Sequence, residues 1–71
     1  MTLEQIRNIL HGSDPFVIRM VSGREYLVEH PDFAGLGRDF ATLHFTDNQG
    51  RLELIRLSQV ESVNVIREPA V

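Results

Sequence analysis

Segment 16–30 alternates between hydrophobic and polar side chains on its two predicted strands. Alternation of this kind predicts a buried face, because successive side chains of a strand point to opposite sides of the sheet. Ser22-Gly23 interrupts it and predicts a turn, since glycine reaches positive φ without a Cβ penalty. We therefore expect a β-hairpin with strands over 16–22 and 24–30. The side chains expected on its buried face are Phe16, Ile18, Met20, Tyr26 and Val28.

The N-terminal segment shows a helical period instead. Thr2 and Gln5 have the spacing of a capping box, and Pro15 prevents continuation because the residue before a proline avoids the α region. The spacing predicts a helix over 3–11. A helix this short is not stable alone, so its hydrophobic stripe is expected to pack on the sheet. That stripe consists of Leu3, Ile6, Ile9 and Leu10.

Three later segments predict strands over 40–46, 51–57 and 62–66. The segment 31–37 contains one proline and two glycines, which is the composition of a loop. Segment 51–57 carries hydrophobic side chains on both faces, which indicates either a central position in a barrel or a cover supplied by another chain.

These elements predict an α+β fold in a single domain over 1–71. We expect a short N-terminal helix followed by five antiparallel strands that form a strongly bent sheet or a small open barrel. The element order is similar to that of Sm-like and SH3-like barrels. The alternative is a flat antiparallel meander with the helix packed on one face.

The residues shared with a known pattern lie in the first half of the chain. This half resembles a group of short bacterial proteins in which a brief helix precedes a "PF.I…GR.Y.V.HP(D/E)" stretch. The group has no established activity, so the resemblance implies a fold and a bacterial source but no chemistry. The matching residues are Pro15-Phe16, Ile18, Gly23-Arg24, Tyr26, Val28 and His30-Pro31-Asp32.

Composition narrows the classes of function. The chain has no cysteine, which excludes a disulfide scaffold and thiol chemistry and fits a reducing cytoplasm. Its net charge of −3 argues against a large phosphate-binding surface, and all seven basic residues are arginines. No hydrophobic run has the length of a membrane helix and no secretion leader is evident. We expect a cytoplasmic protein with no membrane partner and no cofactor.

Four residues are candidates for ligand binding: Arg24, His30, Asp32 and Arg56. His30 and Asp32, two residues apart at a strand end, are the types of side chain that form a general-base pair. The favoured interpretation is structural, with Asp32 capping the turn after Pro31 and His30 making a backbone hydrogen bond.

Two further arrangements of side chains are candidate sites. Arg24 and Tyr26 together with the pair Arg51 and Arg56 suit a nucleotide-stacking surface, although Tyr26 alternates onto the expected core face. The three histidines, with Asp32 or Asp47, would form a metal site only if the fold gathered them, because their spacing matches no ligand motif. No metal and no catalytic residue is therefore expected. The histidines are His11, His30 and His44.

The leading hypothesis for function is a non-catalytic interaction module that associates with itself or with another protein. Lysine, which commonly protects the edges of sheets, is absent from the chain, so an edge strand is open to pairing. A homodimer or a larger ring is expected. An RNA-binding Sm-like ring is the alternative, disfavoured by the acidic charge, and a small hydrolase built on His30 and Asp32 ranks last. The residues expected to mediate self-association are Val17, Val21, Leu27 and Ile55.

Overall fold

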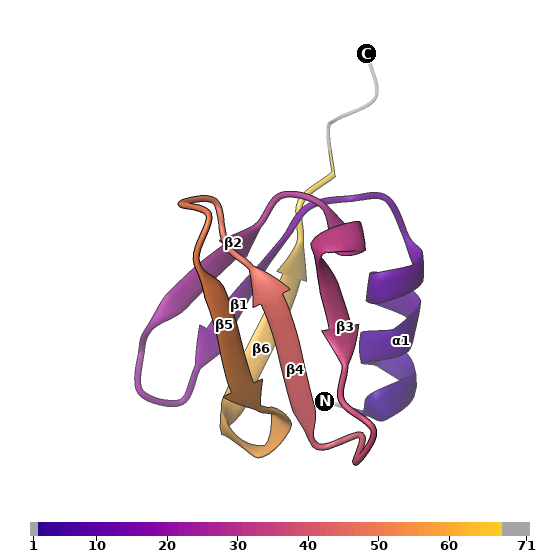
Figure 1. The fold of residues 1–71 in the computed structure, drawn as a ribbon, viewed down its shortest axis with the longest axis vertical. Helices are drawn as coiled ribbons and strands as arrows, with labels where there is room; N and C mark the ends of the chain where they lie inside the picture. The colour runs from indigo at the N-terminus through magenta and orange to yellow at the C-terminus, as the bar shows by residue number, and fades with distance from the viewer. Residues whose placement is uncertain (1, 68–71) are drawn as a thin grey trace.

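The computed structural model describes residues 2–67 and places them in two small sheets and one helix. Figure 1 shows the helix beside β3, at the opposite side of the molecule from β2 and β5. Within the described residues, no helix combines the length and the hydropathy needed to cross a lipid bilayer. The elements in chain order are α1 (Leu3–His11), β1 (Phe16–Met20), β2 (Glu25–Val28), the 3-10 turn η1 (Pro31–Phe33), β3 (Ala34–Leu36), β4 (Thr42–Thr46), β5 (Leu52–Arg56), the 3-10 turn η2 (Leu57–Gln59) and β6 (Val60–Val65).

Helix α1 has the predicted bounds and the predicted cap. The Gln5 backbone N–H donates to Thr2 Oγ1 at 3.2 Å, and the Thr2 backbone N–H donates to Gln5 Oε1 at 2.9 Å. These two bonds satisfy backbone donors that the first turn of a helix leaves free. Ile6 is buried, and Ile9 and Leu10 pack against the core, so the hydrophobic stripe is the buried face of the helix.

The β1–β2 hairpin confirms the predicted turn and the predicted buried face. Gly23 has φ +94°, in the left-handed region that favours glycine. Ile18 stands opposite Tyr26 in the ladder, and its side chain is fully buried. Both strands are shorter than expected, because the Met20 N–H bonds to the Arg24 carbonyl and the turn begins there. Phe16 and Val28 are buried, and Met20 and Tyr26 are half-buried.

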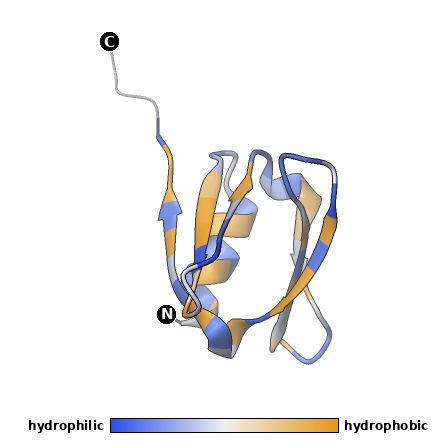
Figure 2. Cartoon of the chain, turned by 90° about the vertical axis from the view of Figure 1, so that its left-hand side faces the viewer, coloured by the Kyte–Doolittle hydropathy of each residue, from blue (hydrophilic) through white to orange (hydrophobic). Residues whose placement is uncertain are grey.

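The single five-stranded sheet, bent or flat, is wrong. The strands form two antiparallel three-stranded sheets, ordered β2-β1-β6 and β3-β4-β5, and no ladder joins them within residues 2–67. The α+β class and the N-terminal helix are confirmed. In Figure 2, which looks from the β2 and β5 side, hydrophobic and hydrophilic positions share the strands of both layers. The core between the sheets contains Phe16, Ile18, Val28, Leu43, Phe45 and Ile55.

The expected loop over 31–37 is also wrong, because it contains η1 and the edge strand β3. Gly35 lies opposite His44 in the β3–β4 ladder. A Cβ on Gly35 would stand 2.7 Å from His44 Nε2, so the glycine leaves room for the imidazole against the backbone. Glycine here serves cross-strand packing, although its composition signal is that of a loop.

The β4–β5 hairpin forms as predicted, with shorter strands. Strand β4 starts at Thr42, since Phe40 has φ +54° and belongs to the preceding turn. The 3-10 turn η2 connects β5 to β6, and β6 begins at Val60, two residues earlier than expected. Strand β5 alternates between the core and solvent, with Ile55 buried and its neighbours Leu54 and Arg56 exposed.

Candidate functional site

A cavity of about 240 Å³ lies between β2 and the turn that joins β4 to β5. Strands β2 and β5 are outer strands of different sheets, and no ladder joins them. The cavity therefore lies in the seam between the two sheets, where no backbone hydrogen bonds of a ladder connect β2 to β5. It is lined by Arg24, Glu25, Tyr26, Leu27, Asp47, Asn48, Gln49, Arg51 and Glu53.

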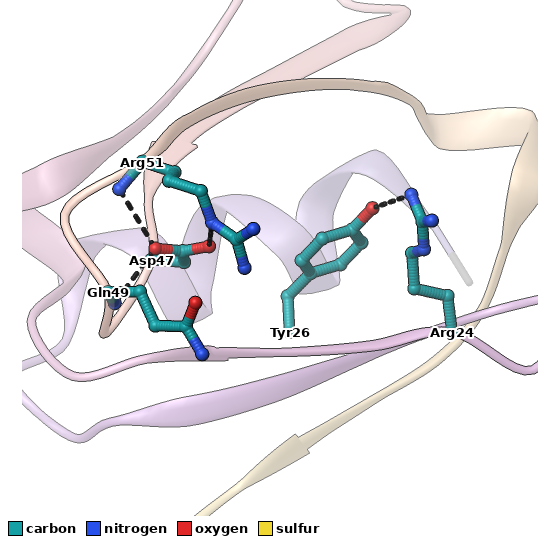
Figure 3. Close-up of polar contacts among 5 residues, drawn as sticks. All are labelled: Arg24, Tyr26, Asp47, Gln49 and Arg51. Atoms are coloured by element: carbon teal, nitrogen blue, oxygen red, sulfur yellow. Dashed lines mark hydrogen bonds and ion pairs between the residues drawn. The ribbon is translucent and has the colours of Figure 1, made fainter.

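Asp47 holds one wall of this cavity in place. Its Oδ1 accepts hydrogen bonds from the backbone N–H groups of Gln49 and Arg51, both at 2.9 Å. Its Oδ2 lies 3.4 Å from Arg51 Nε, as Figure 3 shows. The residue is only 8% exposed, so its carboxylate depends on these partners rather than on water.

The same contacts fix the ionisation of Asp47. The hydrogen bond from the Arg51 backbone N–H lowers the pKa of Asp47 below its usual value, and the Gln49 N–H and the Arg51 guanidinium act in the same direction. Gly50 follows with φ +79°, which closes the turn in a conformation that glycine adopts without strain. Sequence reasoning identified this turn but not the anchoring role of Asp47.

Tyr26 and Arg24 form the opposite wall. Arg24 Nη1 donates a hydrogen bond to Tyr26 Oη at 3.3 Å, and this contact raises the pKa of Arg24. The Tyr26 ring packs edge-on against the buried Phe45 ring, with centroids 5.2 Å apart. Tyr26 thus spans two environments, with a ring packed on the core and a hydroxyl turned to Arg24, as Figure 3 shows.

Of the predicted ligand-binding arginines, Arg24 lines this cavity and Arg56 does not. Arg56 stands opposite Thr42 at the far end of β5 and is exposed on the outer face. Arg51 lines the cavity instead of Arg56. The sequence contains the signal that separates them, because residues five apart on a strand point to opposite faces.

His30 and Asp32 do not form a pair. The His30 ring packs edge-on against Phe33 with centroids 5.4 Å apart, whereas Asp32 lines a different cavity of about 410 Å³ beside Arg7 and His11. The His30 carbonyl accepts from the Phe33 N–H at 3.0 Å, a backbone bond of η1 that does not involve the imidazole. No side chain caps η1, so the cap expected from Asp32 is wrong.

The histidines do not gather into a metal site. His11 lines the 410 Å³ cavity with Asp32, while His44 lies against Gly35 on the outer face of β4. Among residues 2–67, no group of three or more His, Cys, Asp or Glu side chains is placed to hold a metal ion.

The residues expected to mediate self-association differ widely in exposure. Val17 and Leu27 are half-buried neighbours across the β1–β2 ladder, and Val21 is 62% exposed at the hairpin turn. Ile55 is 7% exposed and belongs to the core, so its assignment to an outer surface is wrong.

The exposed hydrophobic side chains of β5 are those that precede Ile55. Leu52 is 70% exposed and Leu54 is 68% exposed. Both lie on the outer face of the β3-β4-β5 sheet, where Leu54 stands opposite His44 and Leu52 opposite Thr46. We call Leu52 and Leu54 the β5 patch. The hydrophobic side chains on both faces of segment 51–57 indicated an exposed patch on this strand. The prediction placed Ile55 in that patch, whereas Leu52 and Leu54 form it.

Comparison with known proteins gives one structural likeness. No protein-family model and no curated protein matches the chain. A solution NMR structure of a candidate lipoprotein from Pseudomonas syringae aligns with a TM-score of 0.61 at 22% sequence identity, over 78% of this chain and 96% of that one. At this identity the likeness shows a shared fold and nothing about activity. The resemblance to short bacterial proteins stays a prediction.

Proposed function

We propose that this chain is a non-catalytic interaction module that self-associates through the free edge of β5. The observation that carries the proposal is the β5 patch, which places two largely exposed leucines on an outer strand. Hydrophobic side chains clustered on a strand that can still accept a neighbour are typical of association surfaces.

The backbone of β5 supports pairing at this edge. The Asp47 N–H donates to the Arg51 carbonyl at 2.9 Å, so the ladder to β4 continues through Glu53 and Ile55. Because backbone groups alternate sides along a strand, those of Leu52, Leu54 and Arg56 point to the free edge. A second copy could therefore add its own β5 in antiparallel register.

Charge selects the register of such a pair. If Leu54 faces the partner's Leu54, Leu52 stands opposite the partner's Arg56 and no like charges meet. A register centred one residue earlier would place Glu53 opposite the partner's Glu53, and like charges directly opposite destabilise a ladder. The result is a two-fold symmetric dimer, the commonest form of soluble assembly.

Sedimentation across a range of concentrations tests this proposal. The wild-type chain should form dimers at micromolar concentration, and Leu54→Glu should shift it to monomer by placing carboxylates opposite each other. Val21→Glu is the matched control, because Val21 is similarly exposed but lies in the β1–β2 turn. A wild-type monomer at high concentration, or dimers unaffected by Leu54→Glu, would reject the β5 edge.

The alternative function, an RNA-binding ring suggested by the element order, can be tested on the same purified protein. That alternative predicts salt-sensitive binding of oligonucleotides, because phosphate contacts release counterions. Fluorescence anisotropy with a short labelled RNA measures it directly. The cytoplasmic location also stays a prediction, tested by fractionation of the source cells.

A further inference from the structure

The seam cavity between β2 and the β4–β5 turn contains positioned hydrogen-bond donors that the fold does not use. Arg51 is held by Asp47 through Nε, and Arg24 contacts Tyr26 through Nη1. Within residues 2–67 the remaining guanidinium N–H groups of both arginines have no protein partner. Each arginine is thus oriented by one contact and free at its other nitrogens, a state suited to binding a carboxylate.

The charge around the cavity is mixed rather than positive. Glu25 and Glu53 line the same cavity as the two arginines, and Glu53 is near enough to Arg24 to contribute to its raised pKa. Asp47 is occupied by its backbone and guanidinium partners. A multiply charged phosphate would meet these carboxylates at a disadvantage, whereas a ligand with one negative and one positive group would satisfy both signs.

Size and shape limit the ligand further. The volume of about 240 Å³ lies below the range of about 300–1,000 Å³ of pockets that hold drug-sized ligands, so the cavity suits a smaller molecule. The Tyr26 ring, fixed against Phe45, supplies an apolar surface for the uncharged part of the ligand. These dimensions match a single amino acid rather than a nucleotide.

We propose that the cavity binds a small zwitterion of the α-amino-acid type. Its carboxylate accepts hydrogen bonds from Arg51, its ammonium group lies by Glu53, and its side chain packs on Tyr26. Arg24, on the other side of the Tyr26 ring in Figure 3, adds a second positive charge and orients the Tyr26 hydroxyl. Because the arginines are exposed and such ion pairs are individually weak, we expect a dissociation constant of about 1 mM. This site is distinct from the β5 patch.

Titration of the 15N-labelled chain followed by heteronuclear NMR tests the site, with L-leucine as the probe. Backbone amide signals of Tyr26, Gln49 and Arg51 should shift and saturate. Two analogues separate the charges: 4-methylpentanoate lacks the ammonium group, and 3-methylbutylamine lacks the carboxylate. Each should bind at least about fivefold more weakly, because each leaves one side of the cavity unpaired.

Matched variants assign the effect to the arginines. Arg51→Gln should weaken leucine binding at least about fivefold, as expected for loss of a charge-assisted hydrogen bond. Arg24→Gln should weaken it less, because it removes a nearby positive charge and the hydrogen bond that orients Tyr26. Arg24→Gln leaves the Asp47 turn intact, so it still tests the site if Arg51→Gln disturbs the folding of that turn. Arg38→Gln removes an exposed arginine outside the cavity and should change nothing.

Three results would overturn the assignment. They are shifts that do not saturate by about 20 mM leucine, twentyfold above the expected constant, equal affinity for 4-methylpentanoate, or unchanged binding in both arginine variants. None of them bears on the oligomeric state, which sedimentation measures separately, so failure of this site and failure of the β5 dimer are distinguishable.

Discussion

Replacing Ile18 by alanine probes the centre of the fold. Ile18 lies on β1, the middle strand of its sheet, between Tyr26 of β2 and Val63 of β6. Its side chain has 0% exposure and belongs to the core shared by both sheets. Because the neighbours on either side are held by ladders, they have little freedom to collapse into the space that alanine leaves.

The expected loss of stability follows from the atoms removed. Three carbons leave the core at about 0.8 kcal/mol each, and the residual cavity adds about 1 kcal/mol, for a total of about 3.4 kcal/mol. A chain of 71 residues is expected to have a free energy of unfolding of about 4–10 kcal/mol. The substitution should therefore remove a third or more of the stability and lower Tm by about 14–27 °C.

Urea unfolding followed by far-ultraviolet circular dichroism measures this loss. Val17→Ala is the matched control, since Val17 is the adjacent residue of β1 on the half-buried outer face, and it should cost less than about 1 kcal/mol. If Ile18→Ala costs no more than Val17→Ala, the side chain of Ile18 does not hold the two sheets together and the assignment of the inner face is refuted.

Three other outcomes test the turns and the helix contact. Gly23→Val should cost about 1–2 kcal/mol in denaturant unfolding, because φ is +94° and no neighbour lies within 4 Å to add a clash; Gly23→Asn should cost less, and equal costs would contradict a backbone origin. Asp47→Asn tests the depressed pKa: stability from the Asp47 carboxylate is present above its unfolded value of 3.8 and lost as pH falls through the lower folded pKa. The wild-type advantage over Asp47→Asn should therefore shrink in acid unfolding curves below pH 3.8, and an advantage that grows there would contradict the hydrogen-bond assignment. Arg7→Gln should destabilise slightly, by about 0.5–1 kcal/mol, because the Arg7 guanidinium lies 4.9 Å from the centroid of the Phe40 ring; no change in Tm would show that this contact contributes nothing.

The sequence indicated individual parts of the candidate site, but not which residues come together to form it. Arg24 and the turn at Asp47 were both identified, on segments more than twenty residues apart. What brings them together is the approach of β2 to β5 across the core, which no local pattern encodes. Arg56 was named among the ligand-binding candidates and Arg51 was not, whereas the structure places Arg51 at the cavity and Arg56 outside it.

By itself the sequence determined the helix, its cap, both hairpin turns and the buried face of β1. Capping, turn chemistry and side-chain alternation depend on residues a few positions apart, so each is legible from the chain. Only the tertiary structure decided that the strands split into two sheets, that Gly35 pairs within β3 opposite His44, and that a cavity lies in the seam. These features depend on contacts between distant segments, whose formation is governed by packing and loop closure rather than by local preference.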